Sequence, residues 1–507
     1  MRHKIGLFLG VVIFILILLA PAPTGMSILA KRAAACAILM AIWWITEAIP
    51  IPATALLPLI LYPTLKIMPA KEAAIPYADR NIFLFMGGFF IAMAMQRWEL
   101  HKRIALYIIR ILGTSPRKLI LGFMVATGFL SMWISNTATT MMMFPIGLAV
   151  IMHAKLMIGK ERMGISTEPG RFNFGIGLML GIAYAASIGG IGTLVGTPPN
   201  IVFAGVLKSL FPGAPEIEFF EWMKVGIPLV IIFLPIVWFY LTYIILPPRL
   251  RKIPGGKEVI EDDLKALGRM KKGEKLTLIV FCLTALGWIG RSNIDIGIFV
   301  IPGWADLLEI GKYVHDSTVA IFGALLLFLI PVDFRRRVFV LDWDWAKRIP
   351  WGIILLFGGG FALAASFQST GLAEWIGGKL EGLAGVPVVW MIISICLLLT
   401  FLTELTSNTA TTTMMMPILA SMAVAIRVHP FLLMIPATIS ASCAFMLPVA
   451  TPPNAIIFGS GYLSIPTMAR VGVILNFIGA FIVTLVVYLI AIQVFGISIG
   501  ALPLWVE

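Results

Sequence analysis

Two copies of the pentapeptide SNTAT place hydroxyl and amide groups inside stretches that are otherwise apolar. They run from Ser135 to Thr139 and from Ser407 to Thr411, so their first residues are 272 positions apart. Ser, Asn and Thr side chains bond to backbone groups at helix ends, and their oxygens are suited to hard cations. Helix packing is enough to explain a single SNT, whereas two matched copies predict a binding site.

A second pair of motifs follows each SNTAT. The stretch GTPPN (Gly196–Asn200) matches ATPPN (Ala450–Asn454) at an offset of 254 positions. Tandem prolines remove backbone donors and clash with the preceding turn, which predicts broken helices around residues 197–199 and 451–453. The freed carbonyl oxygens suit a cation, and the N-terminus of each following half-helix offers N–H groups to an anion.

The charge of the segments that carry these motifs indicates what the site lacks. The segments are residues 119–152, 173–207, 386–426 and 431–469. Together they contain one carboxylate, Glu404, and no Lys or Arg. Helix ends carry only about half a unit charge each, which compensates a dianion poorly, so co-bound sodium ions are expected. Ser131 and Thr403 lie one helical turn before the two SNTAT copies and add a matched hydroxyl to each candidate cation site.

The composition shows which solvent the elements face. The 507 residues are 60% hydrophobic and 12% charged, which predicts an all-α polytopic membrane protein. About eleven crossings are expected near residues 5–21, 33–49, 51–65, 81–97, 174–193, 222–246, 275–290, 318–332, 350–368, 431–448 and 469–496. Residues 119–154 and 386–426 are expected to form re-entrant hairpins with SNTAT at their tips. The first apolar stretch is interpreted as a spanning helix rather than a signal peptide.

The chain divides into two repeated halves, residues 1–254 and 276–507, joined by a charged cytoplasmic linker at 255–275 that is expected to be a loop. FMGGF at Phe85 and FGGGF at Phe357 repeat at the same 272-residue offset as SNTAT. Five expected crossings separate the hairpins, and this odd number predicts an inverted repeat, with hairpin 119–154 cytoplasmic and hairpin 386–426 outside.

Charge placement sets the expected orientation. The Lys and Arg residues behind the net charge of +13 cluster in loops expected on one side of the membrane, whereas segments on the other side carry more acids than bases. This asymmetry indicates a cytoplasmic N-terminus in the inner membrane and gives nucleic-acid binding little support. The four cysteines and five histidines lack metal-ligand spacing, and the Met runs at 141–143 and 414–416 are interpreted as packing. The intramembrane carboxylates Glu47 and Glu404 are either functional or cap a helix. The segments that carry the motifs contain only Glu404, whereas an intramembrane enzyme would need a convergent set of acid, base or nucleophilic groups.

WWITEAIP (Trp43–Pro50), together with the paired SNTAT and TPPN motifs, resembles the divalent anion/sodium symporter family of di- and tricarboxylate carriers. The resemblance covers nearly the whole chain and implies a homodimer in which a transport domain moves as an elevator against a fixed scaffold. It implies substrate contacts at Asn136, Thr137, Thr197, Pro198, Asn408, Thr409, Thr451 and Pro452. It implies sodium ligands at Ser131, Ser135, Asn136, Gly196, Thr403, Ser407, Asn408 and Ala450.

The resulting functional hypothesis is sodium-coupled import of C4 dicarboxylates such as succinate, malate or fumarate. The expected partners are the anion, sodium, membrane lipid and a second copy of the chain, with no organic cofactor. An exchanger of di- or tricarboxylates and a sulfate carrier on the same scaffold remain alternatives. In the family that this chain resembles, Ser often stands at the position of Thr197. The resemblance therefore implies that Thr197 bears on substrate choice.

Overall fold

The computed structural model describes residues 2–113, 115–160, 166–248, 256–295, 299–383 and 385–506. Helices dominate the described residues, which confirms the predicted all-α class. The described strands form two antiparallel ribbons, β1 (Ile294–Asp295) with β2 (Val300–Ile301) and β3 (Pro331–Asp333) with β4 (Val338–Phe339).

The first half carries the helices before residue 249. They are α1 (Arg2–Leu19), α2 (Ile28–Thr46), α3 (Ile51–Thr54), α4 (Leu57–Thr64), α5 (Ala70–Ala74), η1 (Ile75–Ala78), α6 (Arg80–Arg97), α7 (Leu100–Leu112), α8 (Pro116–Ser131), α9 (Asn136–Lys160), α10 (Asn173–Gly190), α11 (Pro198–Leu210), α12 (Phe219–Phe239) and the π-helical η2 (Tyr240–Ile245). The side chain of Asp79 caps α6 by accepting from the backbone N–H of Asn81, as an N-cap residue does.

The part of the chain after residue 255 carries the remaining helices. It contains α13 (Gly256–Leu267), α14 (Lys272–Ile289), α15 (Trp304–Leu307), α16 (Asp316–Leu329), α17 (Trp343–Ala346), α18 (Trp351–Thr370), α19 (Leu372–Leu380), η3 (Glu381–Leu383), α20 (Val388–Thr403), α21 (Asn408–Ala425), α22 (Phe431–Ser440), α23 (Pro452–Phe458), α24 (Ile465–Val486), the π-helical η4 (Val487–Ala491), α25 (Ile492–Val494) and η5 (Leu504–Val506). Nine of the eleven predicted crossings coincide with a helical stretch. The crossing predicted at 51–65 is instead the two short helices α3 and α4, and the one predicted at 431–448 is helical only as far as Ser440, where α22 ends. Among the described residues, 7 helical stretches are long and apolar enough to cross a membrane.

The predicted linker at 255–275 is not a loop in the part that the structure describes, which begins at residue 256. Helix α13 occupies Gly256–Leu267, and α14 begins at Lys272. The expectation was wrong because α13 is amphipathic: Ile260 is buried, and Val259 and Leu264 pack against the core. Helix α13 contacts α7 and α9, so the connection between the halves is itself packed.

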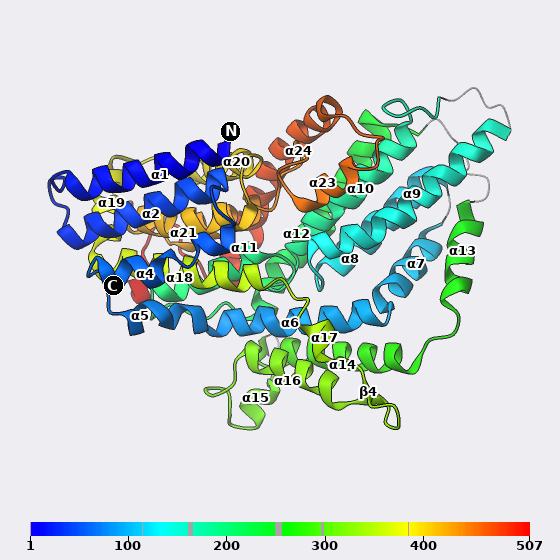
Figure 1. Ribbon diagram of the computed structural model, residues 1–507, viewed down its shortest axis with the longest axis horizontal. Helices are drawn as coiled ribbons and strands as arrows, with labels where there is room; N and C mark the ends of the chain where they lie inside the picture. Colours follow the sequence, from blue (N-terminus) through cyan, green and yellow to red (C-terminus); the bar gives the residue numbers. More distant parts are fainter. Residues whose placement is uncertain are drawn as a thin grey trace.

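The two hairpins lie toward opposite ends of the molecule. Figure 1 shows α8 and α9 toward the right and α20 and α21 toward the left, with α12 between them. Pro145 lies inside α9 and Pro417 lies inside α21, at the 272-residue offset of the repeat. Each hairpin has two helical arms joined by a short tip, as its sequence predicts. Their depth in a membrane stays a prediction.

Equivalent residues of the two halves meet at the centre. Phe85 of α6 and Phe357 of α18 contact each other edge to face, with ring centroids 5.2 Å apart. The contacts are also reciprocal, because α9 packs on α23 while its counterpart α21 packs on α11. A pseudo-two-fold axis produces this pattern, because it turns the contact between α9 and α23 into the contact between α21 and α11.

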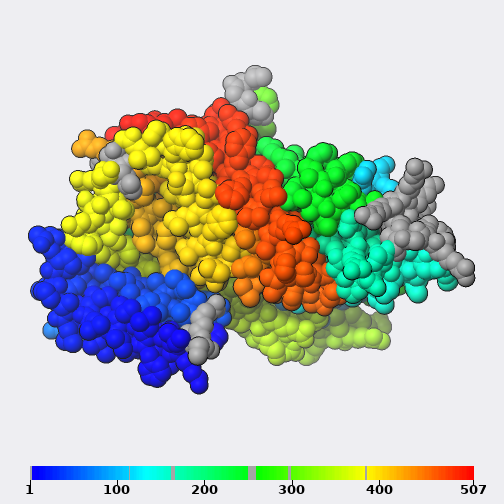
Figure 2. Space-filling view, turned by 90° about the horizontal axis from the view of Figure 1, so that it is seen from above, coloured from blue at the N-terminus to red at the C-terminus, as the bar shows by residue number. Residues whose placement is uncertain are grey.

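The glycine-rich motifs allow close helix packing, as predicted. A methyl group at Gly87 would meet the backbone of Ala320, and one at Gly359 would meet the backbone of Ala55. Helix α24 contacts α12, α20 and α22. Figure 2 shows this orange-red part of the chain between the yellow residues of the second half and the green and cyan residues of the first.

Candidate substrate and cation site

The first SNTAT tip gathers three oxygen atoms around one hydroxyl proton. Helix α8 ends at Ser131, and the Ser131 Oγ lies 2.6 Å from Asn136 Oδ1 and 2.7 Å from the carbonyl oxygen of Ala186. A hydroxyl group has a single proton to donate, so it satisfies only one of these two acceptors. Neutral oxygens in excess of protons are a favourable environment for a hard cation.

The second tip repeats this geometry. Thr403 ends α20 and donates its hydroxyl to Asn408 Oδ1 at 2.7 Å. One turn earlier, Thr400 donates to the carbonyl oxygen of Ser440 at 3.3 Å. Ser440 and Ala186 are 254 positions apart, the offset of the TPPN motifs, so the hairpin contacts the same repeat position in both halves.

The helix breaks begin earlier than the prolines alone predict. Helix α10 ends at Gly190, and the prolines are the first two residues of α11, where their missing N–H groups cost nothing. Residues 191–197 form the first unwound segment. Residues 441–451, between α22 and α23, form the second. The predicted breaks are confirmed, and each is longer than the motif that predicted it.

The asparagine of each TPPN motif closes its own unwound segment. Asn200 Nδ2 donates to the carbonyl oxygen of Thr193 at 2.7 Å and faces that of Gly190 at 3.3 Å. Because α10 ends at Gly190 and the chain is unwound up to α11, the asparagine amide supplies these carbonyl oxygens with a donor in place of a helical N–H group.

The second half repeats this closure at the 254-residue offset. Asn454 Nδ2 donates to the carbonyl oxygens of Leu447 at 3.0 Å and Ala444 at 3.2 Å. The acceptor residues are the repeat equivalents of Thr193 and Gly190. The same side chain therefore shapes both unwound segments.

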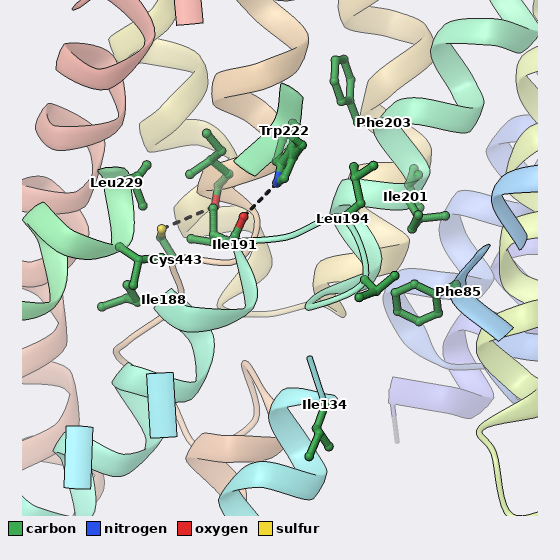
Figure 3. Close-up of a cluster of buried hydrophobic side chains, with 14 of the residues drawn as sticks. Phe85, Ile134, Ile188, Ile191, Leu194, Ile201, Phe203, Trp222, Leu229 and Cys443 are labelled. Atoms are coloured by element: carbon green, nitrogen blue, oxygen red, sulfur yellow. Dashed lines mark hydrogen bonds between the residues drawn. The ribbon is translucent and has the colours of Figure 1, made fainter. Parts of the chain in front are cut away.

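Buried aromatic side chains hold one carbonyl oxygen of each unwound segment. Trp222 Nε1 donates to the carbonyl oxygen of Ile191 at 2.8 Å, a bond that Figure 3 shows among buried apolar side chains. Tyr184 donates its hydroxyl to the carbonyl oxygen of Phe445 at 2.7 Å. Ile191 and Phe445 are again 254 positions apart. Tyr184 lies on α10, so the first half anchors the unwound segment of the second.

The sequence-predicted residues fall into matched places. Ser131 and Thr403 end the first arms, Ser135 and Ser407 precede the second arms, and Asn136, Thr137, Asn408 and Thr409 form the first turns of α9 and α21. Gly196 and Ala450 precede Thr197 and Thr451, which are the N-caps of α11 and α23, and Pro198 and Pro452 follow as the first helical residues. Pro452 is exposed, whereas its counterpart Pro198 is half-buried.

Contacts between elements bring these places together across the halves. The second arm of each hairpin packs on the half-helix of the other half, α9 on α23 and α21 on α11. Within the first half, Gly190 lies so close to Asn136 that an added methyl group would overlap Asn136 Oδ1. The broken ends therefore come from four segments that touch one another.

Several residues of this arrangement were not among the predicted site residues. Asn200 and Asn454 had a detectable signal, because both end a repeated TPPN motif. Trp222 and Tyr184 had none, because their role depends on which carbonyl oxygens the fold brings to them. The carboxylate of Glu404 does not cap a helix: it accepts backbone N–H groups from Phe445, Met446 and Leu447, which lie in the second unwound segment.

Glu47 occupies the end of α2. It adopts a left-handed conformation with φ of 50°, and its backbone N–H bonds to the carbonyl oxygen of Trp43. A residue in this conformation commonly terminates a helix. The backbone of Glu47 therefore serves as a C-cap.

A cavity of about 540 Å³ lies beside the first hairpin. Its lining includes Ala138, Met141 and Met142 of α9 and Gln96, His101 and Lys102 around the end of α6. Ala138 is two residues from Asn136, so the cavity reaches the base of the first tip.

Comparison with known proteins identifies close relatives. Residues 2–502 match the family model described as the sodium:sulfate symporter transmembrane region. The chain is 46% identical over 98% of its length to the sodium-dependent dicarboxylate transporter SdcS of Staphylococcus saprophyticus, covering 92% of that protein. It is 47% identical over 99% of its length to SdcS of Staphylococcus aureus strain MRSA252, covering 94% of that protein.

Two solved structures share the fold at low sequence identity. Neisseria gonorrhoeae MtrF, described as representing a class of antimetabolite efflux pumps, aligns with a TM-score of 0.59 at 11% identity, over 98% of this chain and 97% of that one. The Alcanivorax borkumensis YdaH transporter aligns with a TM-score of 0.51 at 12% identity, over 80% of this chain and 83% of that one. Both support a membrane-transporter fold.

Proposed function

Because the chain belongs to the sodium:sulfate symporter transmembrane family, we propose that it imports C4 dicarboxylates such as succinate, malate or fumarate together with sodium ions. Its relatives are transporters and not enzymes. Sodium is the co-transported ion in this proposal, and no organic cofactor takes part.

The paired oxygen clusters at the two tips carry the proposal. Ser131 with Asn136, and Thr403 with Asn408, each place a hydroxyl oxygen and an amide oxygen within 2.7 Å of one another. The four segments around them supply no cationic side chain to a dianion. Sodium ions at the tips would supply that positive charge, and anion binding would then depend on sodium.

The proposed contacts follow the family resemblance residue by residue. The dicarboxylate would meet the first turns of α9 and α21 and the N-termini of α11 and α23, through Asn136, Thr137, Thr197, Pro198, Asn408, Thr409, Thr451 and Pro452. Sodium would bind at Ser131, Ser135, Asn136 and Gly196 in the first half and at Thr403, Ser407, Asn408 and Ala450 in the second. Helix N-termini favour carboxylates through their free N–H groups.

Transport would proceed by an elevator-type movement in a homodimer. We place the chain in the inner membrane with a cytoplasmic N-terminus, because Lys and Arg gather in the loops expected on that side. Residues 1–254 and 276–507 would be the inverted halves, and membrane lipid would surround the scaffold.

Uptake of radiolabelled succinate into proteoliposomes tests the proposal. Wild-type uptake should require an inward sodium gradient, and Asn136→Ala and Asn408→Ala should abolish it while the protein remains monodisperse. Thr403→Ser keeps the hydroxyl group and should retain uptake, whereas Thr403→Val should raise the sodium concentration needed for half-maximal rate. Sodium-independent uptake by the wild type, or normal uptake by both asparagine variants, would refute the proposal.

A sulfate carrier is the second candidate because the family description names sulfate. Sulfate in excess should leave succinate uptake unchanged if the site is built for C4 dicarboxylates. Strong competition by sulfate would favour the second candidate. Uptake that needs a counter-anion inside the vesicle instead of sodium outside would favour an exchanger.

A further inference from the structure

Glu404 accepts three consecutive backbone N–H groups of the second unwound segment. Its Oε1 accepts from the backbone N–H of Phe445 at 2.8 Å and of Met446 at 2.9 Å, and its Oε2 accepts from that of Leu447 at 3.0 Å. Asn476 of α24 donates its amide to Oε1 at 2.9 Å. The side chain is 3% exposed. One buried carboxylate therefore joins the end of α20, three consecutive backbone amides and α24.

The first half joins the same two repeat positions without a charge. Met132 is 272 positions before Glu404, and Thr193 is 254 positions before Leu447. There the Thr193 hydroxyl donates to the carbonyl oxygen of Met132. The link is neutral in the first half and charge-assisted in the second, and charge-assisted hydrogen bonds are the stronger kind.

Glu404 also makes the two tips electrostatically different. It directly follows Thr403, whose hydroxyl bonds to Asn408 Oδ1, and it carries the one formal charge of the four segments that build the site. A negative charge in a low-dielectric environment stabilises a nearby cation and repels a nearby dianion. The second tip should thus favour sodium and disfavour a dicarboxylate until sodium is bound.

We propose that Glu404 is a positioning residue that makes the second cation site the tighter one, by tying residues 445–447 to the end of α20 beside Thr403 and by adding a fixed negative charge. This inference deepens the proposed function and rests on sodium coupling.

Binding of ²²Na⁺ to the purified full-length chain, without dicarboxylate, tests this difference between the tips. Glu404→Gln keeps the size of the side chain but removes the charge and turns an N–H donor toward a backbone amide. Loss of a charged hydrogen bond should weaken the tighter sodium site about tenfold or more. In uptake assays the sodium concentration for half-maximal rate should rise, while the rate at saturating sodium stays near wild type.

Thr193→Val is the matched control, because it removes the equivalent link in the first half. It should leave the tighter sodium site at its wild-type affinity. Asn476→Ala keeps the charge and the three backbone bonds of Glu404 and removes one donor, so it should weaken the tighter site measurably but less than Glu404→Gln does.

Three outcomes separate the claims. Wild-type sodium affinities in a folded Glu404→Gln protein would overturn the role of Glu404 and leave sodium coupling intact. If Glu404→Gln does not fold, wild-type sodium affinity in Asn476→Ala would overturn the role instead. Absence of sodium binding to the wild-type protein would refute the proposed function itself.

Discussion

Phe85 and Phe357, which are 272 positions apart in the sequence, contact each other edge to face with ring centroids 5.2 Å apart. Residues related by an internal repeat touch only where they lie on the axis that relates the two halves. The FMGGF and FGGGF motifs thus mark the centre of the molecule. Their glycines admit the neighbouring helices, and their phenylalanines join the halves.

The phenylalanine pair should contribute measurable coupling to stability. Phe85→Leu and Phe357→Leu should each lower the melting temperature, because both rings are buried. In the double variant the loss should be smaller than the sum of the single losses, with a coupling of about 0.5–1.5 kcal/mol. Thermal unfolding in detergent measures all four proteins. Strictly additive losses would contradict a direct contact.

Gly190 should tolerate no side chain, although its counterpart has one. A methyl group at Gly190 would overlap Asn136 Oδ1, so Gly190→Ala should displace the first tip and reduce sodium-dependent uptake at least tenfold. Position 444 of the second half already carries a methyl group, and Ala444→Gly should retain uptake within a few-fold. Equal loss in both variants would show that backbone flexibility, and not this overlap, is decisive.

Asn200 should be more sensitive to a charge than to truncation. Asn200→Ala removes the side-chain donor of the Thr193 and Gly190 carbonyl oxygens, which costs about 1–3 kcal/mol. Asn200→Asp directs a carboxylate at the same oxygens and should be less stable still. Melting temperatures should therefore fall from wild type to Ala to Asp. A more stable Asp variant would contradict the donor role of this amide.

His315 should make stability depend on pH. It caps α16, with Nδ1 accepting from the backbone N–H of Ser317 at 3.1 Å. Burial and, to a smaller extent, nearby Arg80 lower the pKa of His315 to about 4 against the opposing effect of Glu216. The unfolded chain, in which histidine titrates near pH 6.5, takes up this proton first. The stability held by neutral His315 is complete above about pH 6.5 and decreases as the pH falls toward 4.

Melting temperatures at pH 7.5 and pH 5 measure this dependence. The wild type should melt at a lower temperature at pH 5, and His315→Asn, which keeps a capping acceptor but does not titrate, should show a smaller difference. His429, whose pKa burial also lowers to about 4, is present in both proteins, so the comparison isolates His315. An unchanged pH dependence in His315→Asn would exclude the proposed contribution.

Sequence reasoning predicted most of the helices and both breaks because each has a local cause. Apolar length predicts a spanning helix, and tandem prolines interrupt one. It failed at residues 256–267, where charged residues obscured an amphipathic helix whose apolar side packs on the core. Regular spacing of Ile260 and Leu264 was the available signal.

The sequence by itself determined the chemistry of the site: two SNTAT tips, two proline breaks and one carboxylate among four segments without cationic side chains. These are properties of residue type and spacing, and they do not depend on distant contacts. Only the tertiary structure decided what holds the site together. Trp222 reaches Ile191, Tyr184 reaches Phe445 and Glu404 reaches residues 445–447, because hydrogen-bond partners far apart in the chain are chosen by packing.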